Sequence, residues 1–200
     1  GYGNGYENLI LSGRISSDRT LETGKTYKLR GTVYVVDGAK LTIQPGVTIQ
    51  GEKSSRGALV ITRGTQIFAN GTADKPIVFT SDAATPQRGD WGGLVILGRA
   101  KTNATFNGMA GVGEIEGGIN NAEGLGLYGG ADDNDNSGVL RYVRVEYAGY
   151  AFLPDKELKT GNNKSISKTL NTTAINEVST DSLKNCATSC PLVEPVTFRM

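Results

Sequence analysis

Histidine is absent from this chain of 200 residues. Its absence removes the commonest general base, the commonest zinc ligand and the usual pH-sensitive switch of proteins. A Ser-His-Asp triad or a Cys-His pair cannot exist without an imidazole to accept the proton of the nucleophile. The sequence therefore excludes a hydrolase that builds either arrangement within this chain.

A surplus of positive charge is also lacking. Lysine and arginine number 21 against 20 aspartates and glutamates, a net charge of +1. Proteins that bind nucleic acids through phosphate contacts need basic residues concentrated on one face, so we predict no nucleic-acid binding. No apolar run approaches the roughly 18 residues that cross a bilayer, so we predict no transmembrane segment. The chain opens without a methionine, which is typical of a processed or trimmed chain and leaves room for an upstream export signal.

Cysteine occurs only at Cys186 and Cys190, in the segment "NCATSCP". The short spacing permits a small disulfide loop, which we predict if the protein reaches an oxidising compartment. Free thiols are the alternative. A two-ligand metal site is the weaker interpretation, because no further cysteine or histidine exists to complete it.

Glycine, in contrast, is plentiful at 28 residues, and hydrophobic residues make up 38% of the chain, enough for a packed core. Apolar residues occur in short bursts rich in Val, Ile, Leu and Thr, each bounded by Gly, Pro, Asn or Asp. Such bursts are typical of β-strands, and no helical stripe interrupts them. They occupy residues 27–36, 40–51, 58–64, 65–71, 76–81, 93–98 and 139–149. The sequence therefore predicts an all-β protein.

One short segment of the sequence recurs. "LTIQPGVTIQG" at 41–51 matches "LVITRGTQIFANG" at 59–71 when the two are laid 18 residues apart, with Gly46 on Gly64. A period near 20 with short strands in each unit is typical of a coil stacked on itself. We therefore predict a parallel β-helix, a solenoid in which inward side chains form aliphatic ladders and glycines allow the turns between faces. A β-sandwich is the alternative.

The chain divides into segments of different character. Residues 1–8 are glycine-rich, and we expect a flexible tether. Residues 9–158 are expected to form the β-helix domain. Within it, residues 100–138 break the strand rhythm, and we interpret them as a loop excursion of the kind that carries binding functions. Residues 159–200 are polar, and we expect a C-terminal extension.

Acidic residues concentrate in "ADDNDNSG" at 131–138. Asp132, Asp133 and Asp135 supply closely spaced oxygen ligands, which suits Ca²⁺ as a cofactor. An EF-hand is rejected, because its twelfth position would be Arg144 rather than glutamate and a strand follows instead of a helix. A calcium loop of another type remains a hypothesis beside the favoured alternative, a solvated turn.

Trp91 is the only tryptophan and lies between glycines in "GDWGG". The glycines would leave the indole face free to stack on a sugar, with help from Tyr128, Tyr147 and Tyr150. The favoured alternative is that Trp91 fills the end of a turn of the coil, where its glycines allow close approach of the backbone.

The strand "LRYVRVEY" alternates in a way that places Arg144 and Glu146 together on an outward surface. We expect them to contact a ligand or to form a solvated ion-pair ladder. Parallel β-helices that cleave polysaccharides use calcium-bound carboxylates with a basic residue, or paired carboxylates. Candidates for that chemistry are Arg141, Arg144, Glu146, Asp90, Glu114 and Glu116.

The phrases "GDWGGLVILGRA", "GEIEGG" and "YGGADDNDNSGVLRYVRVEYAG" resemble a group of exported Bacteroidota surface proteins, often labelled as transporters. The resemblance covers roughly residues 9–158 and implies a right-handed parallel β-helix. It also implies export and a place at the outer-membrane surface or outside the cell, commonly as a lipoprotein. It supplies no established activity, and the tail after "KELKTGNNKS" departs from the family's pattern.

We therefore expect a non-catalytic binding or structural module at the cell surface. Its partner would be a glycan or an outer-membrane protein complex, for example as one subunit of a glycan-uptake assembly. The alternative is a calcium-dependent polysaccharide lyase or glycoside hydrolase on the same scaffold.

Overall fold

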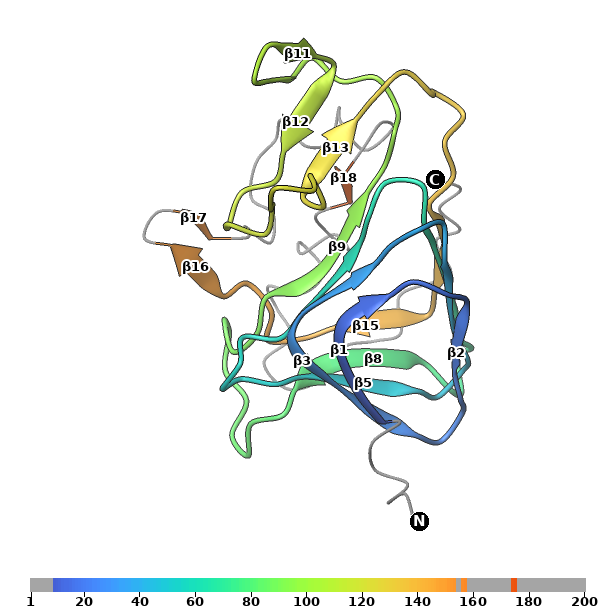
Figure 1. The fold of residues 1–200 in the computed structure, drawn as a ribbon. Helices are drawn as coiled ribbons and strands as arrows, with labels where there is room; N and C mark the ends of the chain where they lie inside the picture. The colour runs from blue at the N-terminus through green and yellow to red at the C-terminus, as the bar shows by residue number, and fades with distance from the viewer. Residues whose placement is uncertain (1–8, 154–155, 158–173, 176–200) are drawn as a thin grey trace, which may run out of the picture.

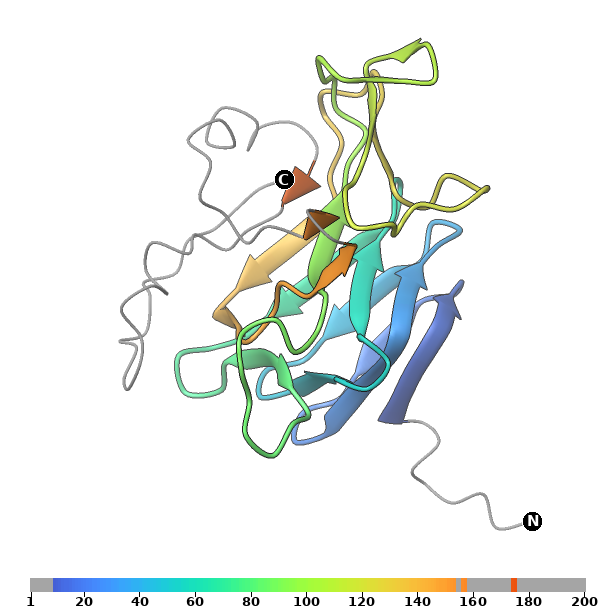
Figure 2. The same ribbon diagram turned by 90° about the vertical axis from the view of Figure 1, so that its left-hand side faces the viewer.

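The structure is a computed structural model that describes residues 9–153, 156–157 and 174–175. Its strands wind into a coil with three faces, each turn lying on the turn before it (Figures 1 and 2). Face A consists of the second half of β1 (Ile10–Ile15), the second half of β3 (Thr26–Val35), β6 (Ala58–Ile61) and β9 (Gly93–Leu97), while the first half of β1 pairs with the first half of β3 in face C. Face B consists of β2 (Arg19–Leu21), β4 (Lys40–Ile43), β7 (Gln66–Asn70) and β14 (Gly138–Arg141). Face C consists of the first half of β3, β5 (Thr48–Gly51), β8 (Ile77–Ser81) and β15 (Val143–Val145).

Neighbouring strands within each face are parallel. In face C, for example, Thr26 pairs with Thr48, which pairs in turn with Val78. The predicted parallel β-helix is confirmed. The alternative β-sandwich is wrong, because its sheets would be built from antiparallel neighbours.

Inward side chains from the three faces fill the coil. They stack in register because each strand lies directly on its partner in the previous turn, so aliphatic residues alternate inward along every strand. Burying one such side chain contributes roughly 1.5–3 kcal/mol. The ladders are Val35, Ile61 and Ile96 in face A, Leu41 and Ile67 in face B, and Tyr27, Ile49 and Phe79 in face C.

The two matching segments, 41–51 and 59–71, do not lie on one another in successive turns of the coil. Leu41 of face B pairs with Ile67, whereas Leu59 belongs to face A and pairs with Val33 and Leu94. Before the lobe, the separation of paired positions grows along the coil, from 18 residues between Ile10 and Lys28 to 26 between Leu41 and Ile67 and 35 between Ala58 and Gly93. The two segments look alike because strands of different faces share the same alternation of apolar and polar residues. The sequence match therefore aligned strands that are not neighbours in the sheet.

Between β9 and β14 the chain leaves the coil and forms two antiparallel hairpins. The first joins β10 (Thr105–Phe106) to β11 (Met109–Ala110), and the second joins β12 (Val112–Glu114) to β13 (Leu127–Gly129). We call residues 98–137 the lobe. It projects beyond the coil at the top of both views (Figures 1 and 2).

The lobe packs on the outer surface of face A. There the outward side chains of Val60, Val95 and Leu97 are buried against Ile115 and Ile119 of the lobe. We call these five residues the satellite core. The hydroxyl of Tyr34 donates a hydrogen bond to the carbonyl of Ile119 at 2.6 Å. This contact explains why β6 reads "ALVI" without alternation: one side of the strand faces the coil interior and the other faces the lobe.

The remaining described strands are short. β16 (Ala151–Leu153) pairs with β17 (Lys156–Glu157), and β18 (Ala174–Ile175) pairs with β9, both antiparallel. Among the described residues, no helix has the length and apolar character to cross a membrane. The predicted tether at 1–8, most of the extension at 159–200, and both Cys186 and Cys190 lie outside the described residues.

Candidate functional site

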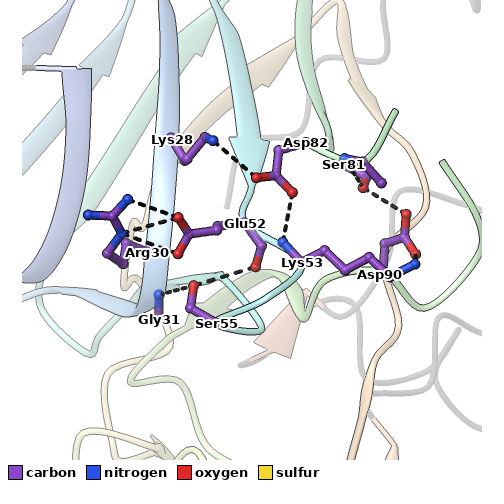
Figure 3. Close-up of polar contacts among 10 residues, drawn as sticks. Lys28, Arg30, Gly31, Glu52, Lys53, Ser55, Ser81, Asp82 and Asp90 are labelled. Atoms are coloured by element: carbon purple, nitrogen blue, oxygen red, sulfur yellow. Dashed lines mark hydrogen bonds and ion pairs between the residues drawn. The ribbon is translucent and has the colours of Figure 1, made fainter. Parts of the chain in front are cut away.

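Charged side chains gather at the edge between faces C and A, where successive turns of the coil change direction (Figure 3). They come from β3, from the corner after β5 and from the loop between β8 and β9. We call Lys28, Arg30, Glu52, Lys53, Asp82 and Asp90 the corner network.

Asp90 is the most buried acid of this network, with 4% of its surface exposed. Its carboxylate accepts hydrogen bonds from Lys53 Nζ at 2.8 Å, Ser81 Oγ at 2.7 Å and the backbone N–H of Gln87 at 3.0 Å. Burial raises the pKa of Asp90, but these donors outweigh burial and hold the pKa below its ordinary value of 3.8. Asp90 is therefore ionised at neutral pH, with both oxygens engaged, and is a poor candidate for a general acid.

Two further carboxylates bridge neighbouring turns. The Arg30 guanidinium donates to both oxygens of Glu52 at 2.9–3.2 Å and holds the pKa of Glu52 below its ordinary value. Asp82 pairs with Lys28 Nζ at 3.1 Å and accepts the backbone N–H of Lys53 at 2.8 Å. These carboxylates are committed to holding one turn on the next, so we interpret the corner network as structural.

Trp91 is wholly buried, which contradicts the sugar-stacking hypothesis and agrees with the favoured alternative that the side chain fills the coil. Its ring stacks on Phe79, with the centroids 6.4 Å apart and the planes 7° from parallel. The indole N–H donates to the carbonyl of Glu146 at 2.7 Å, so its polar group is satisfied without solvent. Trp91 fills the coil interior and offers no face to a ligand.

The predicted tyrosine contacts lie in different parts of the molecule. Tyr147 and Tyr150 follow β15, and the side chain of Tyr147 is exposed. The Arg56 guanidinium lies 4.7 Å from the ring centre of Tyr150, a cation–π contact. Tyr128 belongs to β13 of the lobe, where its half-buried ring packs against the satellite core. The structure therefore places Tyr128 on a different element from Tyr147 and Tyr150.

Arg144 and Glu146 form an ion pair at 2.6 Å beside face C. Glu146 also accepts a hydrogen bond from the hydroxyl of Thr80 at 3.0 Å. The Arg144 side chain is half exposed, so the pair contributes little to stability. Its position on the surface is compatible with a ligand contact and with a solvated ion pair alike.

Asp132, Asp133 and Asp135 are not grouped as the calcium hypothesis requires. Asp133 accepts the backbone N–H of Lys101 at 3.1 Å and pairs with its Nζ at 3.0 Å, while Asp135 accepts the backbone N–H of Arg99 at 2.8 Å. Asp132 caps a backbone N–H two residues further on. In the described part of the chain, no three acidic, cysteine or histidine side chains are grouped to hold a metal ion. Asp133 and Asp135, near the end of the lobe, instead bind residues at its start.

The candidates for polysaccharide cleavage are scattered. Glu114 and Glu116 belong to the lobe, where Glu114 accepts a hydrogen bond from the Asn120 side chain at 3.0 Å. Arg141 is exposed at the end of β14, and Asp90 is engaged in the corner network. Within the described residues, no hydrogen bond or ion pair joins any two of these four candidates.

A hollow of about 390 Å³ lies where the lobe meets the coil. Its lining residues are Thr62, Arg63, Arg99, Glu123, Gly124 and Leu125. Sequence reasoning missed the two arginines. Each arginine comes two residues after a strand of face A, which is a feature of the sequence. That the two strands are neighbours is known only from the structure, in which Ile61 pairs with Ile96.

Burial and the neighbouring charge of Arg99 lower the pKa of the Arg63 guanidinium, so the two cations lie close enough to repel one another. One Arg63 nitrogen donates to the carbonyl of Gly129 at 2.9 Å, which ties the coil corner to β13. A Cβ built on Gly64 would collide with the Arg99 guanidinium, so this glycine leaves room for Arg99 to lie across the corner.

Comparison with known proteins identifies the family. The family model for the pectate-lyase-like β-helix domain matches residues 13–181, which is most of the chain. A search of curated proteins and a search of solved structures each found no match. The match agrees with the parallel ladders and the stacked turns, and the chain therefore belongs to the pectate-lyase-like β-helix family.

Proposed function

We propose that this protein is a non-catalytic binding module in which the coil is the scaffold and the lobe supplies the contact surface. The observation that carries this proposal is the satellite core. It anchors an excursion of some forty residues on face A through five buried side chains. A loop ordered before binding loses little conformational entropy when its ligand arrives, which favours affinity.

The module acts after export, at the outer-membrane surface, as a binding protein or as a subunit of a glycan-uptake assembly. The resemblance of residues 9–158 to exported surface proteins supports this location. The lobe also offers contact features of its own, namely the hollow at its base and the exposed Met109 in the first hairpin. Its partner would be a glycan or an outer-membrane protein.

The placement of the ionisable groups does not favour a lyase or hydrolase. Asp90 uses both oxygens within the fold, and Arg144 is paired with Glu146. Glycan cleavage by paired carboxylates needs two of them on opposite sides of one bond, roughly 5–10 Å apart. Glu114, in contrast, is hydrogen-bonded within the lobe.

Co-purification from native outer membranes, followed by a glycan array, tests the proposal. Tagged wild-type protein is compared with Ile119→Asp, which places a charge in the satellite core, and with Thr42→Ala on the outer surface of face B as a matched control. We expect wild type and Thr42→Ala to retain the same partner and Ile119→Asp to lose it. Equal retention by all three, or cleavage of array glycans that stops in EDTA, would overturn the proposal.

A further inference from the structure

The hollow at the base of the lobe carries more positive charge than the fold itself uses. Among the residues that the structure describes, no carboxylate forms an ion pair with the guanidinium of Arg63 or of Arg99. Glu123, the acid that lines the hollow, is paired with Arg14. Asp135 accepts the backbone N–H of Arg99, not its side chain.

Two guanidinium groups side by side repel each other, and partial burial of Arg63 adds a desolvation cost. Like charges in one hollow without a carboxylate partner are unfavourable. We therefore interpret the arginine pair as a binding feature for a group of opposite charge. Each guanidinium presents a planar fork of N–H donors that matches the oxygens of a carboxylate, sulfate or phosphate group. An anion placed between the two would relieve the repulsion and gain charge-assisted hydrogen bonds.

We propose that the hollow binds an oxyanion group of the ligand, held between Arg63 and Arg99. This inference rests on the proposed binding function and names the chemistry that the lobe would recognise. A hollow of about 390 Å³ falls at the small end of ligand sites, which span roughly 300–1,000 Å³. It therefore has room for one charged group and part of the molecule that carries it.

The two arginines contribute differently. Arg63 already donates to the Gly129 carbonyl, so it is held in place by the lobe. Arg99 lies over Gly64, and no hydrogen bond from its guanidinium is seen within the described residues. Replacing Arg99 therefore removes charge from the hollow without breaking a side-chain hydrogen bond or ion pair among the described residues, which makes it the cleaner variant.

Titration of the full chain with defined probes tests the inference. The probes are glucuronate, glucose 6-sulfate and glucose 6-phosphate, with glucose as the neutral control, all at one ionic strength. Backbone NMR shifts of Thr62 and Gly124 report binding at the hollow. The protein forms are wild type, Arg99→Gln, Arg63→Gln and the double variant. Arg88→Gln is the matched control, because Arg88 is exposed in the loop before β9, away from the hollow.

We expect at least one charged probe to bind wild type and glucose to leave the shifts unchanged. Arg99→Gln should weaken binding roughly tenfold, the double variant should abolish it, and Arg88→Gln should bind as wild type does. The charged probe that binds most tightly identifies the oxyanion as carboxylate, sulfate or phosphate. Equal binding by wild type and the double variant overturns the inference. Failure of every charged probe to bind also overturns the inference. If the capture of a partner from membranes still depends on the lobe in that case, the proposed binding function is retained without the oxyanion site.

Discussion

Trp91 occupies the space that a side chain at position 51 would need. A Cβ built on Gly51 would lie 2.5 Å from three atoms of the Trp91 side chain, well inside van der Waals contact. Gly51 pairs with Leu29 and Ser81 in face C. Because glycine has no side chain, it leaves a space in this row of residues, and the indole fills that space. The largest side chain of the interior thus depends on a residue forty positions earlier.

Gly51→Ala is expected to destabilise the coil by about 1–3 kcal/mol, because the added methyl group forces the indole out of its position. Urea denaturation measures the free energy of unfolding. In the Trp91→Phe background the same substitution should cost less, because the smaller ring leaves room, and a double-mutant cycle measures the difference. Equal costs in the two backgrounds would show that the contact between the residues is not the cause.

Asp90→Asn is expected to destabilise the protein by about 2 kcal/mol at neutral pH, because the buried carboxylate loses its charge-assisted bonds to Lys53 and Ser81. The pKa of Asp90 is lowered in the folded state. Its contribution is therefore fully present above the ordinary value of 3.8 and is lost as the pH falls through the lowered folded pKa.

The difference in unfolding free energy between wild type and Asp90→Asn should therefore shrink below about pH 4. Glu116→Gln serves as the control, because Glu116 is an exposed acid outside the corner network. A difference that stays constant down to about pH 3 would mean that Asp90 stabilises the fold by shape and not by charge.

Ile119→Asp is expected to detach the lobe while the coil stays folded. The new carboxylate cannot be solvated between Val60 and Leu97, so the satellite core should open. Hydrogen exchange should accelerate in β12 and β13 and stay slow in β4 and β5. Loss of protection in both regions at once would show that lobe and coil fold as a single cooperative unit.

Asp135→Ala is expected to loosen the base of the lobe, because the backbone N–H of Arg99 loses its acceptor. Exchange of that amide should accelerate, whereas Asp132→Ala, which removes only a local turn bond, should leave it unchanged. Since these carboxylates serve backbone donors, Ca²⁺ should not raise the melting temperature of either form. A clear rise in wild type that is absent in Asp135→Ala would restore the calcium hypothesis.

The sequence predicted the fold class correctly, but it did not predict which strands lie next to one another. Short β-branched bursts and recurrent glycines indicated stacked strands, and the parallel ladders confirm them. The match of 41–51 on 59–71 as successive turns was wrong, because alternation along a strand carries no information on which face the strand joins. Leu41 and Leu59 match in sequence but lie on different faces.

The sites were harder to predict because they depend on register. "GDWGG" does not reveal whether its indole is exposed, since the answer depends on how Trp91 meets Gly51. The closely spaced aspartates at 132–135 suggested a metal, yet their partners at Arg99 and Lys101 are more than thirty positions away. Arg63 and Arg99 each look like an ordinary corner residue until the lobe is seen to fold over both.

A methyl–methyl nuclear Overhauser measurement between lobe and coil tests most directly whether the lobe is anchored on face A. We expect cross-peaks from the Ile115 and Ile119 methyls to those of Val60, Val95 or Leu97, because these side chains form the satellite core on face A. Their absence, with Ile115 and Ile119 at random-coil shifts, would contradict an anchored lobe and remove the basis of the binding proposal.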